Sequence, residues 1–174
     1  MNRLYKNLQD LLEQKVGLYI HGVTLFNKES LHIDPLKIAA FNIQIFGQSK
    51  MNKPQVVDAL LEIIPEFDVI LIQEIRDASG EALLELMDLL NQAYPGEFAV
   101  TVSARLGRTR SKEQYAYIYR INELQLLEAN EVSDPEDHFE RPPYIAHFHH
   151  IDTHKELIFV GAHLSPSLAD DEIQ

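Results

Sequence analysis

The feature that most constrains the fold is a run of four apolar residues, Val69 to Ile72, which ends abruptly on Gln73 and Glu74. A short run rich in β-branched residues is typical of a strand that is buried on both faces of a sheet. The charge of Glu74 must stay hydrated, be paired or hold a cation, because the burial of an isolated charge is too costly. Glu74 is therefore either an ordinary polar strand end or part of a functional site.

Composition narrows the class of protein. With 174 residues, 45% of them hydrophobic and 24% charged, the chain is long enough for one globular domain with a real core. The absence of cysteine excludes disulfides and thiolate zinc sites, and the net charge of −12 argues against indiscriminate coating of nucleic acid. No apolar stretch approaches the roughly 18 residues of a membrane span. No secretion signal is recognisable near the N-terminus, so we expect no membrane partner and favour a cytoplasmic location.

The first 35 residues differ from the rest and are interpreted as an N-terminal extension. Leucines at helical spacing predict a short amphipathic helix from Arg3 to Lys15. Leu18 to Ile20 is either a short strand or an apolar tether. Residues 36–174 are expected to form the main domain.

Regular apolar runs begin after Pro35. Lys37 to Asn42 is predicted to be a buried strand, Gly47 to Asn52 a loop, and Pro54 to about Ile64 a helix with proline in its first turn. The strand Val69 to Glu74 follows directly. A strand, a helix and a strand in so few residues form a crossover, which makes the two strands parallel.

The remaining elements alternate between helix, strand and loop. We expect a helix at Glu81–Gln92 and strands at Phe98–Val102, Gln114–Tyr119, Tyr144–His150 and Leu157–Ala162. Alternation places Tyr115, Tyr117 and Tyr119 on one face of their strand. The stretch from Ser103 to Glu113 is a polar loop rich in arginine. The stretch from Glu128 to Glu140 contains six acids and no base, and it is predicted to be a solvated loop.

Three apolar strands end in groups that are suited to chemistry, namely Asn42, Glu74 and His163. If the first two strands are parallel neighbours, their carboxyl ends lie side by side, where open α/β sheets bind their ligands. Amide and carboxylate oxygens suit a hard cation such as Mg²⁺, and a nearby histidine moves protons at neutral pH. Together with the basic loop, these residues favour phosphate-ester chemistry.

Four segments in order closely resemble the deoxyribonuclease I family and its wider endonuclease/exonuclease/phosphatase superfamily. These segments are Lys37–Gly47, Asp68–Asp77, Leu106–Tyr115 and Ala162–Pro166. The resemblance covers residues 36–174. It implies an α/β fold, namely the first half of a two-sheet sandwich that contains a mixed sheet with flanking helices.

The resemblance also implies roles for individual residues. Glu74 would be the metal-binding carboxylate, with Asn42 beside it, and Glu113 would orient His163 as proton donor or acceptor at the scissile phosphate. Three arginines, Arg76, Arg108 and Arg141, match positions that contact the DNA backbone or minor groove. Gln44 and Ser111 depart from the family pattern, which has an arginine and a tyrosine that touch DNA at these positions.

The implied activity is endonucleolytic hydrolysis of DNA with Mg²⁺ or Mn²⁺. A structural Ca²⁺ ion in the acidic loop is an alternative to a plain solvated loop. The family's Gly-Asp-Phe-Asn and Ser-Asp-His motifs do not occur in this sequence, so we expect the chain alone to be inactive or very weak. Self-association or a second chain would complete the sandwich. The alternatives are another superfamily phosphodiesterase or phosphatase, and a non-catalytic half-domain that binds a partner chain.

Overall fold

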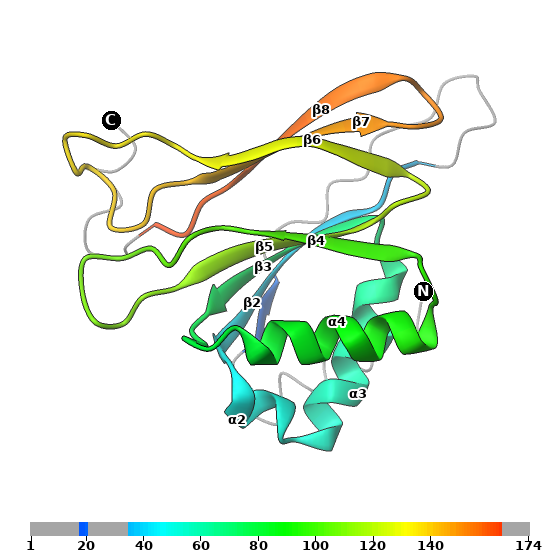
Figure 1. Cartoon of the computed structure of the whole chain (residues 1–174), viewed down its shortest axis with the longest axis horizontal. Coiled ribbons are helices and arrows are strands. Elements are labelled where there is room, and N and C mark those ends of the chain that lie inside the picture. The colour runs from blue at the N-terminus through cyan, green and yellow to red at the C-terminus, as the bar shows by residue number, and fades with distance from the viewer. Residues whose placement is uncertain (1–17, 21–34, 165–174) are drawn as a thin grey trace.

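The computed structural model describes residues 18–20 and 35–164 of the chain (Figure 1). The helix predicted from Arg3 to Lys15 lies outside these residues, and the division of the chain near residue 35 stays a prediction. The described residues form three layers, which are a group of helices, a mixed sheet and a second, antiparallel sheet. This arrangement confirms the predicted α/β sandwich with a mixed sheet and flanking helices.

The first sheet has the strand order β1-β2-β3-β5-β4. Its strands are β1 (Leu18–Ile20), β2 (Ile38–Phe46), β3 (Val69–Ile75), β4 (Phe98–Val102) and β5 (Gln114–Arg120). Only β2 and β3 are paired in parallel, which confirms the predicted crossover. Of the two alternatives for Leu18–Ile20, the structure has the strand, which pairs with β2.

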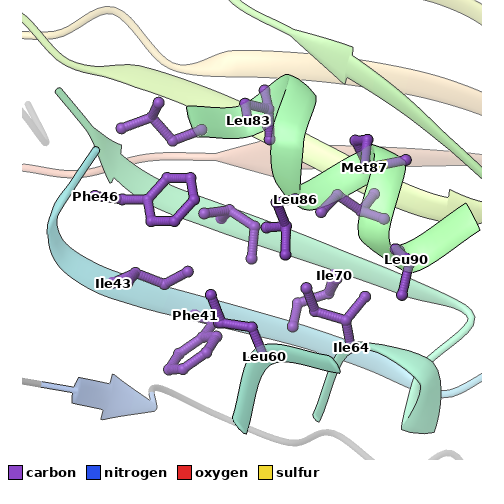
Figure 2. Packing of buried hydrophobic residues seen from close by; sticks show 14 of the residues in the cluster. Phe41, Ile43, Phe46, Leu60, Ile64, Ile70, Leu83, Leu86, Met87 and Leu90 are labelled. Carbon is purple, nitrogen blue, oxygen red and sulfur yellow. The ribbon is translucent and has the colours of Figure 1, made fainter. Parts of the chain in front are cut away.

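Helices cover one face of this sheet (Figure 1). They are α2 (Gln48–Met51), α3 (Pro54–Ile63), the 3₁₀ turn η1 (Ile64–Glu66) and α4 (Glu81–Ala93). Figure 2 shows Leu86 and Leu90 of α4 packed with Phe41 and Ile70 of the sheet, and all four side chains are buried. The prediction of a loop at Gly47–Asn52 was wrong for α2, which forms because burial of Met51 fixes the turn against the core.

The second sheet consists of three antiparallel strands, β6 (Leu124–Glu131), β7 (Tyr144–His150) and β8 (Lys155–Gly161). Strand β6 corrects the prediction that Glu128–Glu140 is entirely a loop, because residues 128–131 belong to it. Leu124 of β6 is buried, and Ala129 packs against the core between the sheets, while Glu128 and Asn130 are exposed. Glu128 is therefore on the solvent face of the strand, whereas Glu131 is half-buried and accepts a hydrogen bond from the Ala104 N–H.

The two sheets pack through the tyrosine face of β5. Ala116 and Ile118 of β5 belong to the helix-side core, while Tyr115, Tyr117 and Tyr119 belong to the core between the sheets. This alternation confirms that the three tyrosines share one face. The ring of Tyr117 stacks on that of Tyr144 of β7 at a centroid distance of 5.8 Å.

The sheets approach one another most tightly at Gly161, the last residue of β8. A Cβ atom at this position would lie 2.8 Å from Leu71 Cδ2 and 3.0 Å from the Tyr117 hydroxyl. Both distances are at or below the limit of real contacts, so a Cβ atom here would force Leu71 or Tyr117 to move within the packed core. Since His163 follows two residues later, this contact brings it close to the ends of β3 and β5.

The outward face of β8 carries apolar residues that the described part of the chain does not cover. Ile158 and Val160 are 66% and 60% exposed.

Within residues 18–20 and 35–164, no helix is long and apolar enough to cross a membrane.

Candidate active site

Glu74 lies in an irregularity of β3 rather than in a regular strand. The register of β3 shifts against β5 between Ile72 and Ile75, and it also shifts against β2. Glu74 has φ 60° and Ile45 of β2 has φ 54°, both in the left-handed region. Such a conformation costs a residue other than glycine about 1–2 kcal/mol and is concentrated at functional sites. A bulge of this kind redirects a side chain, here the carboxylate of Glu74.

Two neighbours from β2 hold the Glu74 carboxylate. The Asn42 side-chain amide donates to Oε1 at 2.8 Å, and the backbone N–H of Ile45 donates to Oε2 at 3.1 Å. The Glu74 side chain is only 14% exposed. The carboxylate is therefore fixed in direction before any ligand binds.

The Asn42 side chain leaves an oxygen available beside this carboxylate. Its Oδ1 atom is buried and has no hydrogen-bond partner among the described residues. Such an atom costs about 1–3 kcal/mol unless a donor or a cation meets it. Within the described part of the chain, no three His, Cys, Asp or Glu side chains converge on one point. One carboxylate and one amide oxygen suit Mg²⁺, which keeps several waters and needs few protein ligands.

The second group of polar residues surrounds Glu113, whose side chain is 4% exposed. His163 Nδ1 lies 3.0 Å from Glu113 Oε2 and Arg76 Nη2 lies 2.6 Å from Oε1. Arg141 Nε is 3.7 Å from Oε2. Burial alone would raise the pKa of the Glu113 carboxyl, but the His163 hydrogen bond and the Arg141, His163 and Arg76 charges outweigh it and hold this pKa below its ordinary value.

The two groups lie next to each other. His163 Nε2 is 3.9 Å from Glu74 Oε1, and Arg76 Nη2 is 3.8 Å from Glu74 Oε2. The structure therefore brings together most of the predicted site residues, namely Asn42, Glu74, Arg76, Glu113, Arg141 and His163. Their arrangement joins a carboxylate–amide pair, suited to a cation, to a carboxylate–imidazole pair, suited to proton transfer.

Arg108 interacts instead with the acidic loop. Its Nε atom lies 3.1 Å from Asp137 Oδ2, its Nη2 donates to the Asp137 carbonyl, and its backbone N–H donates to Glu140 at 3.2 Å. The carboxylate of Asp134 accepts from the backbone N–H groups of His138 and Phe139. These contacts hold the acidic loop without an ion. A structural Ca²⁺ ion in this loop stays a prediction that they do not test.

The two departures from the family pattern have different surroundings. Ser111 Oγ accepts a hydrogen bond from Arg76 Nη1 at 2.9 Å, so it supports the arginine that contacts Glu113. Gln44 is exposed.

Sequence reasoning missed two residues that contact the backbone at His163. Gln73 Nε2 donates to the Ala162 carbonyl at 2.9 Å, and the Tyr115 hydroxyl accepts from the His163 N–H at 2.8 Å. The sequence marks Gln73 only as the polar end of a strand and Tyr115 only as part of a tyrosine face. Their positions beside Glu74 and Glu113 in the sequence were the available signal.

Solved structures of other proteins share the fold of the described residues. Similar chains include an endonuclease/exonuclease/phosphatase family protein from Bacteroides thetaiotaomicron, with a TM-score of 0.54 and 18% sequence identity. A mannosyl-6-phosphatase from the same organism has a TM-score of 0.55 and 17% identity. The matches cover 79% of this chain and 54% and 55% of those chains. The described part therefore has the endonuclease/exonuclease/phosphatase fold.

Curated relatives narrow the likeness to deoxyribonuclease I. The chain is 38% identical to bovine (Bos taurus) deoxyribonuclease-1 and 37% identical to the human (Homo sapiens) protein, in each case over 144 residues. It is 34% identical to mouse (Mus musculus) deoxyribonuclease-1-like 2 over 139 residues. The chain is thus deoxyribonuclease I-like over 79% of its length, and it spans about half the length of these relatives, 50–51%. No family model matches the sequence.

The depressed pKa of Glu113 predicts a pH-dependent stability. At neutral pH, we expect Glu113→Gln to lower the free energy of unfolding by about 1–3 kcal/mol, because two arginines then lie beside a neutral group. A depressed folded-state pKa stabilises the fold above the unfolded-state value, about 4.3, and this stabilisation is lost as pH falls through the folded-state value. The difference between variant and wild type should therefore shrink below about pH 4.3.

Urea unfolding at a series of pH values measures this difference. The matched control is Glu85→Gln, which changes an exposed carboxylate on α4 and should leave the pH dependence of stability nearly unchanged. A Glu113→Gln effect of equal size at every pH would contradict the assigned charge pairing.

Proposed function

We propose that this chain supplies one half of the active site of an endonuclease that hydrolyses DNA phosphodiester bonds with a divalent metal. The observation that carries the proposal is the meeting of the Asn42–Glu74 pair and the Glu113–His163 pair, whose nearest polar atoms are 3.9 Å apart. DNA is favoured as substrate because the similar curated proteins are named deoxyribonucleases. The likeness to a mannosyl-6-phosphatase keeps a phosphatase as the alternative activity.

Glu74 and Asn42 are the residues that would hold the metal. Glu74 offers carboxylate oxygens that the Ile45 N–H and the Asn42 amide already orient, and Asn42 offers its unpartnered Oδ1. A bound Mg²⁺ or Mn²⁺ ion supplies neutralisation of the negative charge on the phosphoryl oxygens.

His163 is proposed to move the proton at the scissile phosphate. If Nδ1–H donates to Glu113, the tautomer is fixed and Nε2 is the atom that exchanges a proton with the substrate. Water would attack the phosphorus in line while His163 assists departure of the leaving oxygen. Glu113 stabilises the protonated imidazole, because it is a buried carboxylate in direct contact with the ring.

Arg76, Arg108 and Arg141 are proposed to contact the phosphates of DNA. Their side chains are 31%, 35% and 11% exposed. A guanidinium group has five N–H donors, so contact with Glu113 or Asp137 leaves donors for a phosphate. The arginines also offset the local negative charge of Glu74 and Glu113, which favours approach of a polyanion despite the net charge of −12.

The other half of the site is proposed to come from a second polypeptide or from additional sequence that corresponds to the remaining part of the relatives. Strand β8 is an edge strand of its sheet, and its exposed Ile158 and Val160 face outward beside Ile145 and His147 of β7. An uncovered apolar sheet face favours association, because packed layers hide such faces from water. In the absence of that partner, we expect the chain to associate with itself.

The function is tested with a chimera in which residues 36–174 are joined to the second half of bovine deoxyribonuclease-1. We expect this protein to nick supercoiled plasmid in the presence of Mg²⁺. Glu74→Gln should lower the nicking rate by about 10²-fold or more, because it removes a preoriented charge at the metal. The same change in the 174-residue chain should weaken Mn²⁺ binding measured by electron paramagnetic resonance.

Glu85→Gln is the control, since it removes an exposed carboxylate of α4. Nicking that survives Glu74→Gln and still requires a divalent ion would place the metal elsewhere. A folded, monomeric chimera that cleaves no DNA but hydrolyses a sugar phosphate would favour the phosphatase alternative.

Glu113 and His163 are expected to act as one unit in this chimera. Their single alanine variants should lose similar factors of activity, and the double variant should lose no more than either, because residues that act together are not additive. Nicking rates of the four proteins give the comparison. Losses that multiply in the double variant would show independent roles.

The 174-residue chain alone is expected to cleave DNA at a small fraction of the chimera's rate and to self-associate. Light scattering should give a mass above that of one chain, and Ile158→Lys should reduce it. Leu84→Lys is the matched control, because Leu84 is 63% exposed on α4 at the opposite side of the first sheet. A monomeric chain that nicks plasmid as fast as bovine deoxyribonuclease-1 would refute the need for a second half.

A further inference from the structure

The backbone at His163 has left the ladder of the second sheet. The last pair of β7 and β8 joins Tyr144 to Gly161, so residues 162 and 163 lie beyond the paired region. Polar backbone groups that lose their ladder partners need others if they are shielded from water. The position of His163 therefore depends on whatever replaces the ladder at these residues.

Three side chains from other parts of the chain supply the replacement. Gln73 donates to the Ala162 carbonyl at 2.9 Å, and Arg141 Nε donates to the His163 carbonyl at 3.1 Å. The Tyr115 hydroxyl accepts from the His163 N–H at 2.8 Å. Of the three, Tyr115 contacts the backbone closest to the imidazole side chain of His163. It binds the His163 amide nitrogen, which is bonded directly to the Cα that carries this side chain.

Tyr115 is itself fixed tightly. It is 2% exposed and belongs to the core between the two sheets. Its backbone forms two hydrogen bonds with the buried Ser103, one from the Ser103 N–H to the Tyr115 carbonyl and one from the Tyr115 N–H to Ser103 Oγ, both 2.9 Å long. Its hydroxyl is thus a fixed point of the first sheet.

Residues 113–115 contact both the side chain and the backbone of His163. Glu113 contacts the imidazole through Nδ1, and Tyr115, two residues later, contacts the backbone N–H. Two contacts from one rigid segment define both the place and the direction of the ring, and catalytic groups need such constraint from their surroundings.

We infer that Tyr115 is a positioning residue for His163: its hydroxyl anchors the His163 backbone so that the imidazole meets Glu113 and faces Glu74. Gln73 acts in the same way one residue earlier. This inference rests on the proposed role of His163, and it adds a residue that does not touch substrate or metal. Removal of the Tyr115 hydroxyl leaves its aromatic ring in the core, so a substitution can remove the hydrogen bond to His163 without removing the packing.

The test is Tyr115→Phe in the 174-residue chain labelled with ¹⁵N-histidine. A His163→Gln variant assigns the imidazole ¹⁵N chemical shifts of His163. We expect these shifts to move toward the values of a solvent-exposed histidine that has no carboxylate contact. Hydrogen exchange of the His163 amide should quicken by about tenfold, as expected for the loss of one hydrogen bond. Tyr119→Phe is the control, because Tyr119 is on the same face of β5 and its ring packs against that of Phe148 at a centroid distance of 4.9 Å.

Unchanged His163 imidazole shifts in a folded Tyr115→Phe protein would overturn the inference, as would equal changes in Tyr119→Phe. If Tyr115→Phe does not fold, Gln73→Met serves as the second variant, since it removes the contact with Ala162 at similar volume. Gln73→Met should also move the His163 imidazole shifts. Unchanged shifts in Gln73→Met would count against the inference that these backbone contacts position His163. Neither readout needs DNA cleavage, so the result stands even if the chimera has no nuclease activity.

Discussion

The contact that the rest of the site depends on is the close approach of the two sheets at Gly161. Leu71 and Tyr117 lie where a side chain at this position would have to be. The approach brings the end of β8 against Leu71 and Tyr117 inside β3 and β5, so that His163, two residues later, meets Glu113 across 50 positions of sequence. A wider separation of the sheets would leave both residues in place on their own elements but out of reach of one another.

The charges at the site form a balanced network rather than isolated pairs. Arg76 contacts Glu113 at 2.6 Å and lies 3.8 Å from Glu74, so a single guanidinium group connects the two carboxylates. Ser111 steadies this guanidinium through Nη1. A cation bound at Glu74 would compete with Arg76 for the same carboxylate, because like charges at short range repel. If Glu74 binds a metal as proposed, that binding and the surroundings of Glu113 would be electrostatically linked through Arg76.

Local sequence patterns predicted the elements with strong signals and their order. Val69 to Ile72 gave the central strand, Pro54 the helix start, and the alternation of Tyr115, Tyr117 and Tyr119 one face of β5. The strand β6 was missed because Glu128 and Glu131 make its second half resemble the acidic loop that follows. Proximity of Glu74 to Asn42 followed from parallel strands, whereas the contact of Glu113 with His163 came only from the resemblance. The bulge at Glu74 has no local signal, and for the anchor at Tyr115 the only signal was its position two residues after Glu113.

The two faces of the sandwich differ in how completely they are covered. On the helix side, Phe46 and Ile72 of the sheet and Leu86 of α4 are fully buried in one core. On the far side of the second sheet, the described residues leave Ile158 and Val160 largely exposed, and burial of the remaining surface of each would contribute about 1–2 kcal/mol. The strand that carries this open face also leads directly into His163. If a partner covers β8, as proposed above, it would also steady the segment that leads into His163, and the same contact would then act on the sheet face and on the proposed site.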